Sequence, residues 1–358
     1  MNINSDLGQE IIKRIEEYID VDINIMDLTG KIVASTDEKR INQIHSGAIE
    51  VINTKKELIL YDEDVIRYEG TKPGANLPII HHNKIEGVIG VSGNPDEILP
   101  MTGLIRVSVE IIIEQLYNQR QEYYEERQWN YWLQQLLHPS GLNEAHLKRE
   151  AAYTLHTNME GDWQVVVIEG EHVQNDLEKY RHFLKDQDVL FTLPFLSDEV
   201  VIAFPSSFTH LTKLLHELQH ISNKKFNIGV GEIGKNIKGI RTSYFQAKQA
   251  IAFEASIGSI SYSENWKLER LAYAINENEY KQICSPFEEK LLQLDDVYIE
   301  TLNVYFDMNF SIKSTAKLLH IHRNTLLYRL EQIDKKVGLD PRIFPNAFIL
   351  KLILCKNL

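Results

Sequence analysis

The fold of this chain is decided by the stretch Asn309-Phe-Ser-Ile-Lys-Ser-Thr-Ala-Lys-Leu-Leu-His-Ile-His-Arg-Asn-Thr-Leu-Leu-Tyr-Arg-Leu-Glu-Gln-Ile-Asp-Lys-Lys-Val-Gly338. Apolar residues recur there at helical spacing on both sides of a break at His320-Ile321, and Gly338 is a typical helix terminator. The spacing predicts two helices joined by a tight turn, with Ser311 as the N-cap of the first. The apolar faces are expected to hold Ile312, Ala316, Leu319, Leu326, Leu330, Ile333 and Val337. Two such helices form a helix-turn-helix motif, whose second helix enters the major groove of DNA.

The side chains that this arrangement leaves facing outward suit DNA chemically. Arg and Asn can make paired hydrogen bonds to guanine and adenine edges, and a Thr methyl can meet the thymine methyl. The start of the second helix is therefore expected to read bases, while Lys313, Lys317 and Arg329 contact phosphates. The predicted DNA-binding residues are Lys313, Lys317, His322, Arg323, Asn324, Thr325, Tyr328 and Arg329. The alternative is a three-helix interaction module with a solvated polar face.

The distribution of charge favours DNA over that alternative. Residues 309–358 carry nine Lys and Arg against three Asp and Glu, whereas the whole chain has a net charge of −13. A basic segment on an acidic protein is typical of a DNA contact confined to one domain.

The same segment resembles the C-terminal helix-turn-helix of the PucR-type transcription regulators. The matching residues include Thr315-Ala316, the run Ile321-His-Arg-Asn-Thr-Leu326, Tyr328-Arg-Leu330 and Gly338-Leu-Asp-Pro341. One departure is His320, because many such turns carry Gly at this position. His tolerates the left-handed backbone conformation better than most residues do, so the turn is still expected.

The composition indicates an ordinary globular protein of two or three domains. Hydrophobic residues make up 43% of the 358 and charged residues 25%, and no apolar run approaches the roughly 18 residues of a transmembrane helix. The start, Met1-Asn-Ile-Asn-Ser-Asp6, lacks the basic and apolar pattern of a signal peptide. Cys284 and Cys355 lie far apart without metal-ligand spacing, so a reducing compartment is expected. The sequence therefore predicts a cytoplasmic protein.

The first 100 residues alternate between apolar and polar side chains in a way that predicts a sheet with flanking helices. Helices are expected at residues 3–18 and 46–54, the first with Leu7, Ile11, Ile15 and Ile19 on one face. Strands are expected at residues 22–27, 31–35, 57–61, 75–81 and 85–92. Five antiparallel strands flanked by helices are typical of the PAS or Cache type of small-molecule sensor.

This part of the chain resembles the sugar-diacid recognition domain of the carbohydrate diacid regulator family. The matching segments include Asn24-Ile-Met-Asp27, Arg40-Ile41, Lys72-Pro-Gly-Ala-Asn-Leu-Pro-Ile79 and Gly87-Val-Ile-Gly-Val-Ser-Gly93. The resemblance implies that the domain senses a hydroxy-acid such as glucarate, galactarate or glycerate.

The residues themselves suit such a ligand. A small polyol carboxylate needs a cation or amide donors for its acid and polar groups for its hydroxyls, and a helix N-terminus favours anions. The predicted ligand-binding residues are Ser35, Arg40, His45, Ser46, Gly47, Gly74, Ala75, Asn76 and Ser92. The alternative is that Gly74 only makes a turn, Arg40 pairs on the surface and His45 is a satisfied core residue.

A long helix is expected from Met101 to about His138, restarted by Pro100 after a short helix that Asn94 caps. Ile105, Val109, Ile112, Leu116, Gln119 and Tyr123 follow a coiled-coil-like spacing along it. Packing within one chain and dimerisation with signal transfer explain this seam equally well.

The segment 143–262 predicts the order strand, helix, strand, strand, helix, strand, which is ferredoxin-like. It resembles the GGDEF-like middle domain of the same regulators. The cyclase signature would lie between Leu193 and Glu199, where this chain has Pro194-Phe-Leu-Ser-Asp198. Without the glycines and acids of that signature, nucleotide binding and metal-assisted cyclisation are not expected, and no catalytic residue is assigned.

His216-Glu-Leu-Gln-His220 matches the His-Glu-x-x-His pattern of zinc proteases. The apolar residues of the same segment, Leu211, Leu214, Leu215 and Leu218, place both histidines on the opposite, solvated side of the helix. A catalytic zinc needs a third ligand and a dry cleft. We therefore expect no metal site and no cofactor.

The sequence thus predicts an α+β multidomain protein. Its expected domains are a PAS/Cache-like sensor at residues 1–100, a signalling helix at 101–138, a degenerate GGDEF-like domain at 143–262 and an all-α helix-turn-helix domain at 263–358. The expected function is a cytoplasmic, homo-oligomeric activator that binds double-stranded DNA and controls sugar-acid uptake and catabolism genes. A non-enzymatic signalling scaffold is the main alternative, ahead of a nucleotide cyclase or zinc hydrolase.

Overall fold

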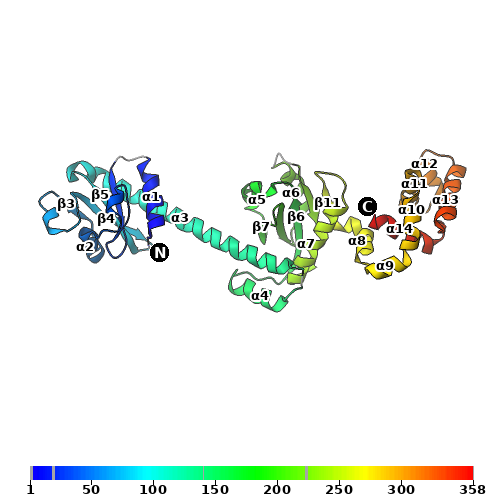
Figure 1. Ribbon diagram of the computed structural model, residues 1–358, viewed down its shortest axis with the longest axis horizontal. Coiled ribbons are helices and arrows are strands. Elements are labelled where there is room, and N and C mark those ends of the chain that lie inside the picture. Colours follow the sequence, from blue (N-terminus) through cyan, green and yellow to red (C-terminus); the bar gives the residue numbers. More distant parts are fainter. Residues whose placement is uncertain (1–2, 18–20, 140, 222–224, 358) are drawn as a thin grey trace. The chain divides into compact units, whose positions relative to one another are not determined.

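The computed structural model describes residues 3–17, 21–139, 141–221 and 225–357 (Figure 1). The chain divides into two compact units, Met1–Glu126 and Arg127–Leu358, and helix α3 (Pro95–Leu137) contributes residues to both. Within the described residues, no helix is long and apolar enough to cross a lipid bilayer.

The first unit is built on a five-stranded antiparallel sheet in the order β2-β1-β5-β4-β3 (Figure 1). The predicted strands and the two helices before β3 are confirmed, with bounds within about two residues of those expected from the sequence. Ile19, expected on the first helix, lies outside the described residues. The elements are α1 (Ser5–Glu16), β1 (Asp22–Met26), β2 (Ile32–Ser35), α2 (Ser46–Thr54), β3 (Leu58–Leu60), β4 (Gly74–His81) and β5 (Lys84–Ser92).

The two faces of this sheet are covered by different helices. Because successive strand residues point to opposite faces, Ile25, Leu77 and Ile89 pack with α1 and the start of α3 in one core. Met26 and Val88 point the other way and form a smaller core with α2. The side covered by α2 is called the α2 face below; it also carries most of the predicted ligand residues.

Helix α3 differs from the expected course in one respect. Pro100 does not restart a helix, because α3 is continuous from Pro95 and contains Pro100 within it. A proline removes one backbone hydrogen bond, and burial of the flanking Ile98 and Ile105 against the sheet offsets that loss. Asn94 does cap this helix, since its side chain accepts from the Asp96 amide at 3.2 Å.

The first half of the coiled-coil-like seam packs within the chain. Ile105 and Val109 are fully buried in the first core, and Ile112 and Leu116 pack partly against it. Farther along, the side chain of Tyr123 is exposed. Intrachain packing therefore explains the start of the seam, while dimerisation through its later part stays a prediction.

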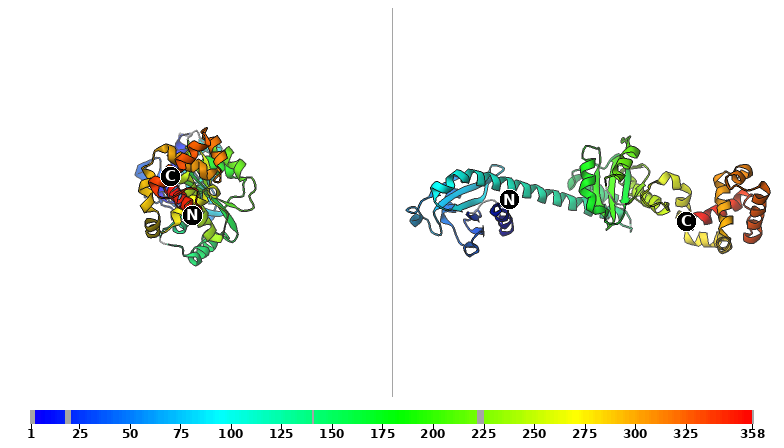
Figure 2. Two further views of the ribbon diagram at one scale, coloured as in Figure 1. Left: turned by 90° about the vertical axis from the view of Figure 1, so that its right-hand side faces the viewer. Right: turned by 90° about the horizontal axis from the view of Figure 1, so that it is seen from above.

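The second unit begins with the sheet drawn mostly in green in Figure 2. Its strand order is β11-β9-β6-β8-β7, with β10 paired to β6. The strands β9, β6, β8 and β7 pair antiparallel in the ferredoxin-like order predicted from the sequence. The strands are β6 (Asp162–Glu169), β7 (Phe191–Phe195), β8 (Glu199–Pro205), β9 (Asn227–Val230), β10 (Gly234–Lys235) and β11 (Ile260–Tyr262).

Helices α5 (Leu177–Leu184) and α6 (Leu211–Gln219) pack on one face of this sheet, against Val166, Ile202 and their neighbours. The opposite face is covered by the end of α3, by α4 (Glu144–Tyr153) and by α7 (Asn236–Phe253). Gly229 allows α7 to pack directly on the strand, because a Cβ at that position would lie 2.1 Å from the Ala247 carbonyl oxygen.

The rest of the second unit is helical, with the predicted helix-turn-helix at α12 and α13 (Figure 1). Helix α10 begins at Ser285, with Pro286 in its first turn. The core that holds α9 to α14 includes Leu302, Leu330 and Ile353. The helices are α8 (Lys267–Ala274), α9 (Glu277–Ile283), α10 (Ser285–Leu292), α11 (Asp296–Asp307), α12 (Ile312–Leu318), α13 (Arg323–Val337) and α14 (Phe344–Lys356).

Candidate DNA interface and effector site

Helices α12 and α13 have the local structure that their sequence predicts. The Ser311 hydroxyl accepts a hydrogen bond from the Ser314 amide at 3.3 Å and so caps α12. Gly338 ends α13 in the left-handed conformation, with φ of 88°. The predicted stripe Leu326, Leu330, Ile333 and Val337 is completely buried. The burial of this stripe fixes which side of α13 faces solvent.

The turn between the two helices passes through His320, which has φ of 53°. Its departure from Gly is therefore accommodated, because His can adopt the left-handed conformation that the turn requires. The Ile321 amide then donates to the Ala316 carbonyl at 3.0 Å and closes the turn. Ala316 is buried where α12 meets α13, as its small side chain predicts.

The start of α13 presents polar side chains to solvent. Arg323, Asn324, Thr325 and Tyr328 are all exposed, together with His322. His322 has an additional role that the sequence reasoning missed, because its Nδ1 accepts from the Asn324 amide at 3.3 Å and caps α13. Its position just before the apolar stripe was the signal for such a cap.

Arg329 corrects one expectation from the sequence. It is half-buried, and its guanidinium donates to the Thr301 hydroxyl of α11 at 3.1 Å instead of facing outward. Arg329 adjoins the buried Leu330, so its long side chain can reach the neighbouring helix. Its role in this structure is to brace α13 against α11.

The cations available to DNA are fewer than the net charge of this segment suggests. Lys351 and Lys356 lie 3.8 and 3.1 Å from the carboxylates of Asp307 and Glu277. Arg342 is hydrogen-bonded to Asp340 and lowers the pKa of that carboxyl. Lys313, Lys317 and Arg323, by contrast, are exposed and have no salt bridge within the part of the chain that the structure describes. These three side chains form the basic surface of α12 and the start of α13, and Lys335 and Lys336 are exposed in the last turn of α13.

The first unit brings polar side chains together in a row across the α2 face of its sheet. Strand pairing places Ser35 opposite Asn24, Asn24 opposite Gly90, and Gly90 opposite Asn76. The Ser35 hydroxyl donates to Asn24 Oδ1 at 2.8 Å, and both residues are buried. Asn24 was not among the predicted ligand residues, although its alternation with Ile23 and Ile25 indicated a polar side chain opposite the core.

Asn76 is the unsatisfied member of this row. Only 3% of the residue is exposed, and its Oδ1 has no hydrogen-bond partner among the described residues. A buried acceptor without a partner costs about 1–3 kcal/mol, so such atoms commonly mark a site for water or ligand. Gly90 packs against this oxygen: a Cβ there would lie 3.0 Å from Asn76 Oδ1 and 3.3 Å from the terminal carbon of Met26.

Arg40 and His45 are buried beside the α2 face, whereas the alternative expectation placed Arg40 on the surface. The Arg40 guanidinium donates to the Gly70 carbonyl, and burial lowers the pKa of Arg40 although Asp37 and Asp22 oppose this shift. Burial, and then the charge of Arg40, lowers the pKa of His45 to about 4. His45 is therefore neutral at physiological pH, and its Nδ1 accepts from the Ala48 amide and caps α2.

The N-terminus of α2 is only partly free to bind an anion. The Ser46 amide and hydroxyl both donate to the Glu69 carbonyl, and His45 occupies the Ala48 amide. Among the hydrogen bonds of the described residues, none uses the Gly47 amide. Of the Ser46 and Gly47 amides at this helix N-terminus, that of Gly47 is thus the one available to an anion.

A second polar row lies next to the first on the α2 face. Strand pairing places Asp22 opposite Ser92, and Ser92 opposite Gly74. A hollow of about 460 Å³ opens here, and Ser92 is the predicted ligand residue that lines it. Lys72 and Asp22 form part of its wall, with Lys72 Nζ 3.4 Å from Asp22 Oδ2. The remaining lining residues are Tyr61, Asp62, Pro73, Gly93, Asn94 and Pro95.

Two of the predicted ligand residues have structural roles instead. Gly74 has φ of 153°, and a Cβ there would lie 2.1 Å from the Val91 carbonyl oxygen, so glycine is required by the backbone. The side chain of Ala75 points into the core on the opposite face, because it alternates with Gly74 and Asn76 along β4. The Ala75 side chain therefore cannot contact a ligand on the α2 face.

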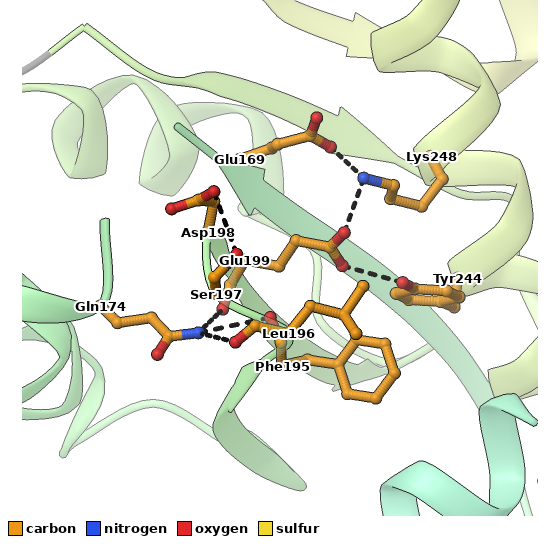
Figure 3. A network of polar contacts seen from close by, with 9 residues as sticks. All are labelled: Glu169, Gln174, Phe195, Leu196, Ser197, Asp198, Glu199, Tyr244 and Lys248. Carbon is orange, nitrogen blue, oxygen red and sulfur yellow. Dashed lines mark hydrogen bonds and ion pairs between the residues drawn. The ribbon is translucent and has the colours of Figure 1, made fainter. Parts of the chain in front are cut away.

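The turn where a cyclase signature would lie is closed by contacts within the chain (Figure 3). The Gln174 side-chain amide donates to the carbonyls of Phe195, Leu196 and Glu199. The Glu199 carboxylate accepts from Lys248 at 2.7 Å and from the Tyr244 hydroxyl at 2.8 Å.

Lys248 also contacts Glu169 (Figure 3). Burial tends to lower the pKa of Lys248, but the hydrogen bonds to Glu169 and Glu199 outweigh it and raise the pKa overall. Lys248 is therefore charged and holds the ends of β6 and β8 to α7. The polar groups near this turn serve the packing of the domain.

The two histidines of the protease-like pattern lie where the sequence predicts. His216 and His220 are exposed, and the leucines of α6 pack into the core on its other side. These positions support the expectation that the pattern arises by chance on a surface helix.

Three family models match successive parts of the chain. The model described as "Putative sugar diacid recognition" matches residues 3–136. The model of the GGDEF-like domain matches residues 140–253, and that of the PucR C-terminal helix-turn-helix domain matches residues 298–354.

The chain is also similar to whole proteins. It is 25% identical over 342 residues to the uncharacterized protein YsfB of Bacillus subtilis, covering 93% of this chain and 92% of that protein. It is 24% identical over 377 residues to the carbohydrate diacid regulator of Escherichia coli, covering 99% of this chain and 97% of that protein. A shorter match, 23% identical over 228 residues, covers 55% of this chain and 54% of the proline-responsive transcriptional activator PutR of Bacillus subtilis.

The helix-turn-helix and these relatives identify the chain as a DNA-binding transcription regulator and not an enzyme. Its GGDEF-like domain shares only the fold of the cyclases. The chain is thus similar to the sugar diacid regulators.

Proposed function

We propose that the protein is a cytoplasmic activator of genes for sugar-acid uptake and catabolism, controlled by a hydroxy-acid bound to its first unit. Glucarate, galactarate and glycerate are the candidate effectors. The single observation that carries the effector site is the buried Asn76 Oδ1, which has no hydrogen-bond partner among the described residues. A ligand hydroxyl that donates to this oxygen would satisfy it.

The surrounding groups supply the rest of the recognition chemistry. Asn24 and Ser35 continue the polar row, and the cation of Arg40 with the Gly47 amide offers two donors for a carboxylate. Arg40 must then exchange its bond with the Gly70 carbonyl for one with the ligand. This exchange gives ligand binding a direct effect on the segment before β4.

The output of the proposed switch is DNA binding by α13. Arg323 and Asn324 read base edges, while Lys313 and Lys317 contact phosphates. Two chains that pair in a homodimer would place their motifs on half-sites about 34 Å, or a multiple, apart. The effector can shift the regulator between two arrangements only by its differential affinity for them.

We further propose the four-part organisation expected from the sequence, with a PAS/Cache-like sensor at residues 1–100, a signalling helix at 101–138, a GGDEF-like domain at 143–262 and the DNA-binding domain at 263–358. In this scheme the middle domain has a structural role, in keeping with the Lys248 and Glu199 contacts that close its turn.

A thermal-shift screen of the full chain against a panel of sugar acids tests the effector site. One acid should raise the midpoint of unfolding in proportion to the logarithm of its concentration, because it binds only the folded state. Arg40→Ala should abolish that shift, whereas the matched control Arg67→Ala, at an exposed arginine outside the site, should preserve it. An acid that stabilises both variants as well as wild type would show that Arg40 does not hold the effector.

A further inference from the structure

A cluster of metal-ligating side chains lies on the face of the first sheet opposite the α2 face. His81 ends β4, His82 follows it in the turn to β5, and Glu114 lies on α3. One ligand atom of each residue, an imidazole nitrogen or a carboxylate oxygen, lies within 4.8 Å of the other two. The cluster lies wholly within the first unit, so its geometry does not depend on the second.

The turn geometry explains how two consecutive histidines reach one site. Consecutive residues of a strand normally point to opposite faces. Here His82 and Asn83 form a two-residue hairpin turn, with φ of 48° and 62°, and this conformation returns the His82 ring to the side of His81. The centroids of the two imidazole rings are 4.1 Å apart.

The contact between His81 and Glu114 is close but is not a hydrogen bond. His81 Nε2 and a Glu114 carboxylate oxygen are 2.8 Å apart. Yet Nε2 is buried without a hydrogen-bond partner among the described residues, because the two atoms do not meet in hydrogen-bonding geometry. Two ligands on one cation have this relation, since the lone pairs of both atoms point to a shared position.

The site is also accessible and supported. His81 is 7% exposed, but His82 is exposed and 48% of the Glu114 side chain is accessible, so a cation can enter from that side. Tyr117, one helical turn beyond Glu114, packs its ring 5.2 Å from that of His81. In a tetrahedral zinc site, bonds of about 2.0–2.2 Å place ligand atoms roughly 3.3 Å apart. Here His81 Nε2 and the Glu114 oxygen are 2.8 Å apart, and all three ligand atoms lie within 4.8 Å of one another.

We propose that His81, His82 and Glu114 bind a divalent transition-metal ion, with zinc as the favoured species. Two imidazoles and a carboxylate select zinc, nickel or copper over magnesium and calcium, which prefer oxygen ligands. The sequence alone predicted no metal site, since Glu114 is separated from the histidine pair by more than thirty residues. The bound ion joins the β4–β5 turn to α3 and fixes this part of the helix on the sheet.

Titration of the chelator-treated full chain with Zn²⁺, followed by calorimetry, tests the proposal. We expect one equivalent to bind per chain with micromolar or tighter affinity, and Mg²⁺ not to compete. His82→Asn should weaken zinc binding more than about 100-fold, because it removes a direct ligand. Asn tolerates the left-handed conformation of this position, so the turn is preserved.

Further variants make the assignment specific. Glu114→Gln keeps the shape of the side chain but removes its charge, and it should also weaken binding. His216→Ala, which removes a histidine from the exposed pair on α6, should leave binding unchanged. With Co²⁺ as the probe, wild type should show the visible absorption of a low-coordinate complex, and His82→Asn should lose it.

Three results would overturn the proposal. They are the absence of saturable zinc binding to wild type, unchanged binding in His82→Asn, and loss of binding in His216→Ala. Any of them would leave His81 and Glu114 as a local ion pair that only packs α3 against the sheet.

Discussion

Replacing Gly90 by alanine adds a methyl group inside the proposed effector site and little elsewhere. Gly90 lies between Asn24 and Asn76 in the polar row of the α2 face. The new Cβ would lie 3.0 Å from Asn76 Oδ1 and 3.3 Å from the terminal carbon of Met26. The backbone of Gly90 does not have the positive φ that would disfavour alanine.

The expected magnitude follows from these contacts. A methyl beside Asn76 Oδ1 blocks the ligand hydroxyl that would satisfy this oxygen, and loss of one such hydrogen bond costs about 1–3 kcal/mol. This corresponds to effector binding that is roughly 5- to 150-fold weaker. The free energy of unfolding should change by less than about 1 kcal/mol, because the flexible Met26 side chain can move and alanine lowers the entropy of the unfolded chain.

Calorimetric titration of the full chain with the acid found by thermal shift measures this effect. The matched control is Gly103→Ala on α3, where a Cβ would meet no atom within 4 Å. That variant should keep wild-type effector affinity and gain about 0.5–1 kcal/mol of stability from helix propensity. Wild-type effector affinity in a correctly folded Gly90→Ala protein would refute the placement of the ligand over this row.

Three further predictions concern DNA, pH and the middle domain. Lys313→Ala and Lys317→Ala should each weaken binding to all DNA sequences alike and lower the slope of log affinity against log salt by about one. Burial keeps His45 neutral in the folded protein with a pKa of about 4, whereas the unfolded residue takes up a proton near the ordinary histidine pKa of 6.5. Lowering the pH from 6.5 to 4 should therefore reduce the unfolding free energy of wild type by up to about 3 kcal/mol more than that of His45→Gln. Urea unfolding at both pH values measures this difference. Lys248→Met leaves the buried Glu199 without its cation and should lower the unfolding free energy of the second unit by about 3 kcal/mol.

Each of these predictions has an outcome that contradicts it. An unchanged salt slope in both lysine variants would place phosphate contacts elsewhere. Equal acid sensitivity of wild type and His45→Gln would mean that His45 does not control it. Lys235→Met, at an exposed lysine, is the control for Lys248→Met, and equal stability of the two variants would show that the Glu199 contact is unimportant.

The sequence predicted most elements of the fold because they depend on local patterns. The stripe that includes Leu326 and Leu330 defined α13, and alternation of side chains defined the strands of both sheets. Pro100 was misleading because the local rule for proline ignores the burial of Ile98 and Ile105. Tertiary packing thus overrode a local signal at that point.

The candidate sites were less predictable, since they depend on contacts between distant segments. Register across two strand pairs is what aligns Asn24 and Asn76, and no local pattern reports it. Arg329 faces inward only because Thr301 of α11 offers a hydroxyl, and that neighbour is 28 positions away. The assembly of His81 and Glu114 depends in the same way on where α3 crosses the sheet.

Selection of bound duplexes from a random DNA library tests most directly whether the start of α13 recognises base sequence. Wild type should enrich one motif, repeated in two half-sites, and Lys313→Ala should enrich the same motif with weaker binding. Arg323→Ala should lose preference at the base pair that this side chain contacts, a change of about 1–3 kcal/mol in discrimination. Enrichment of the unchanged motif by Arg323→Ala, with the same preference at every position, would contradict the account.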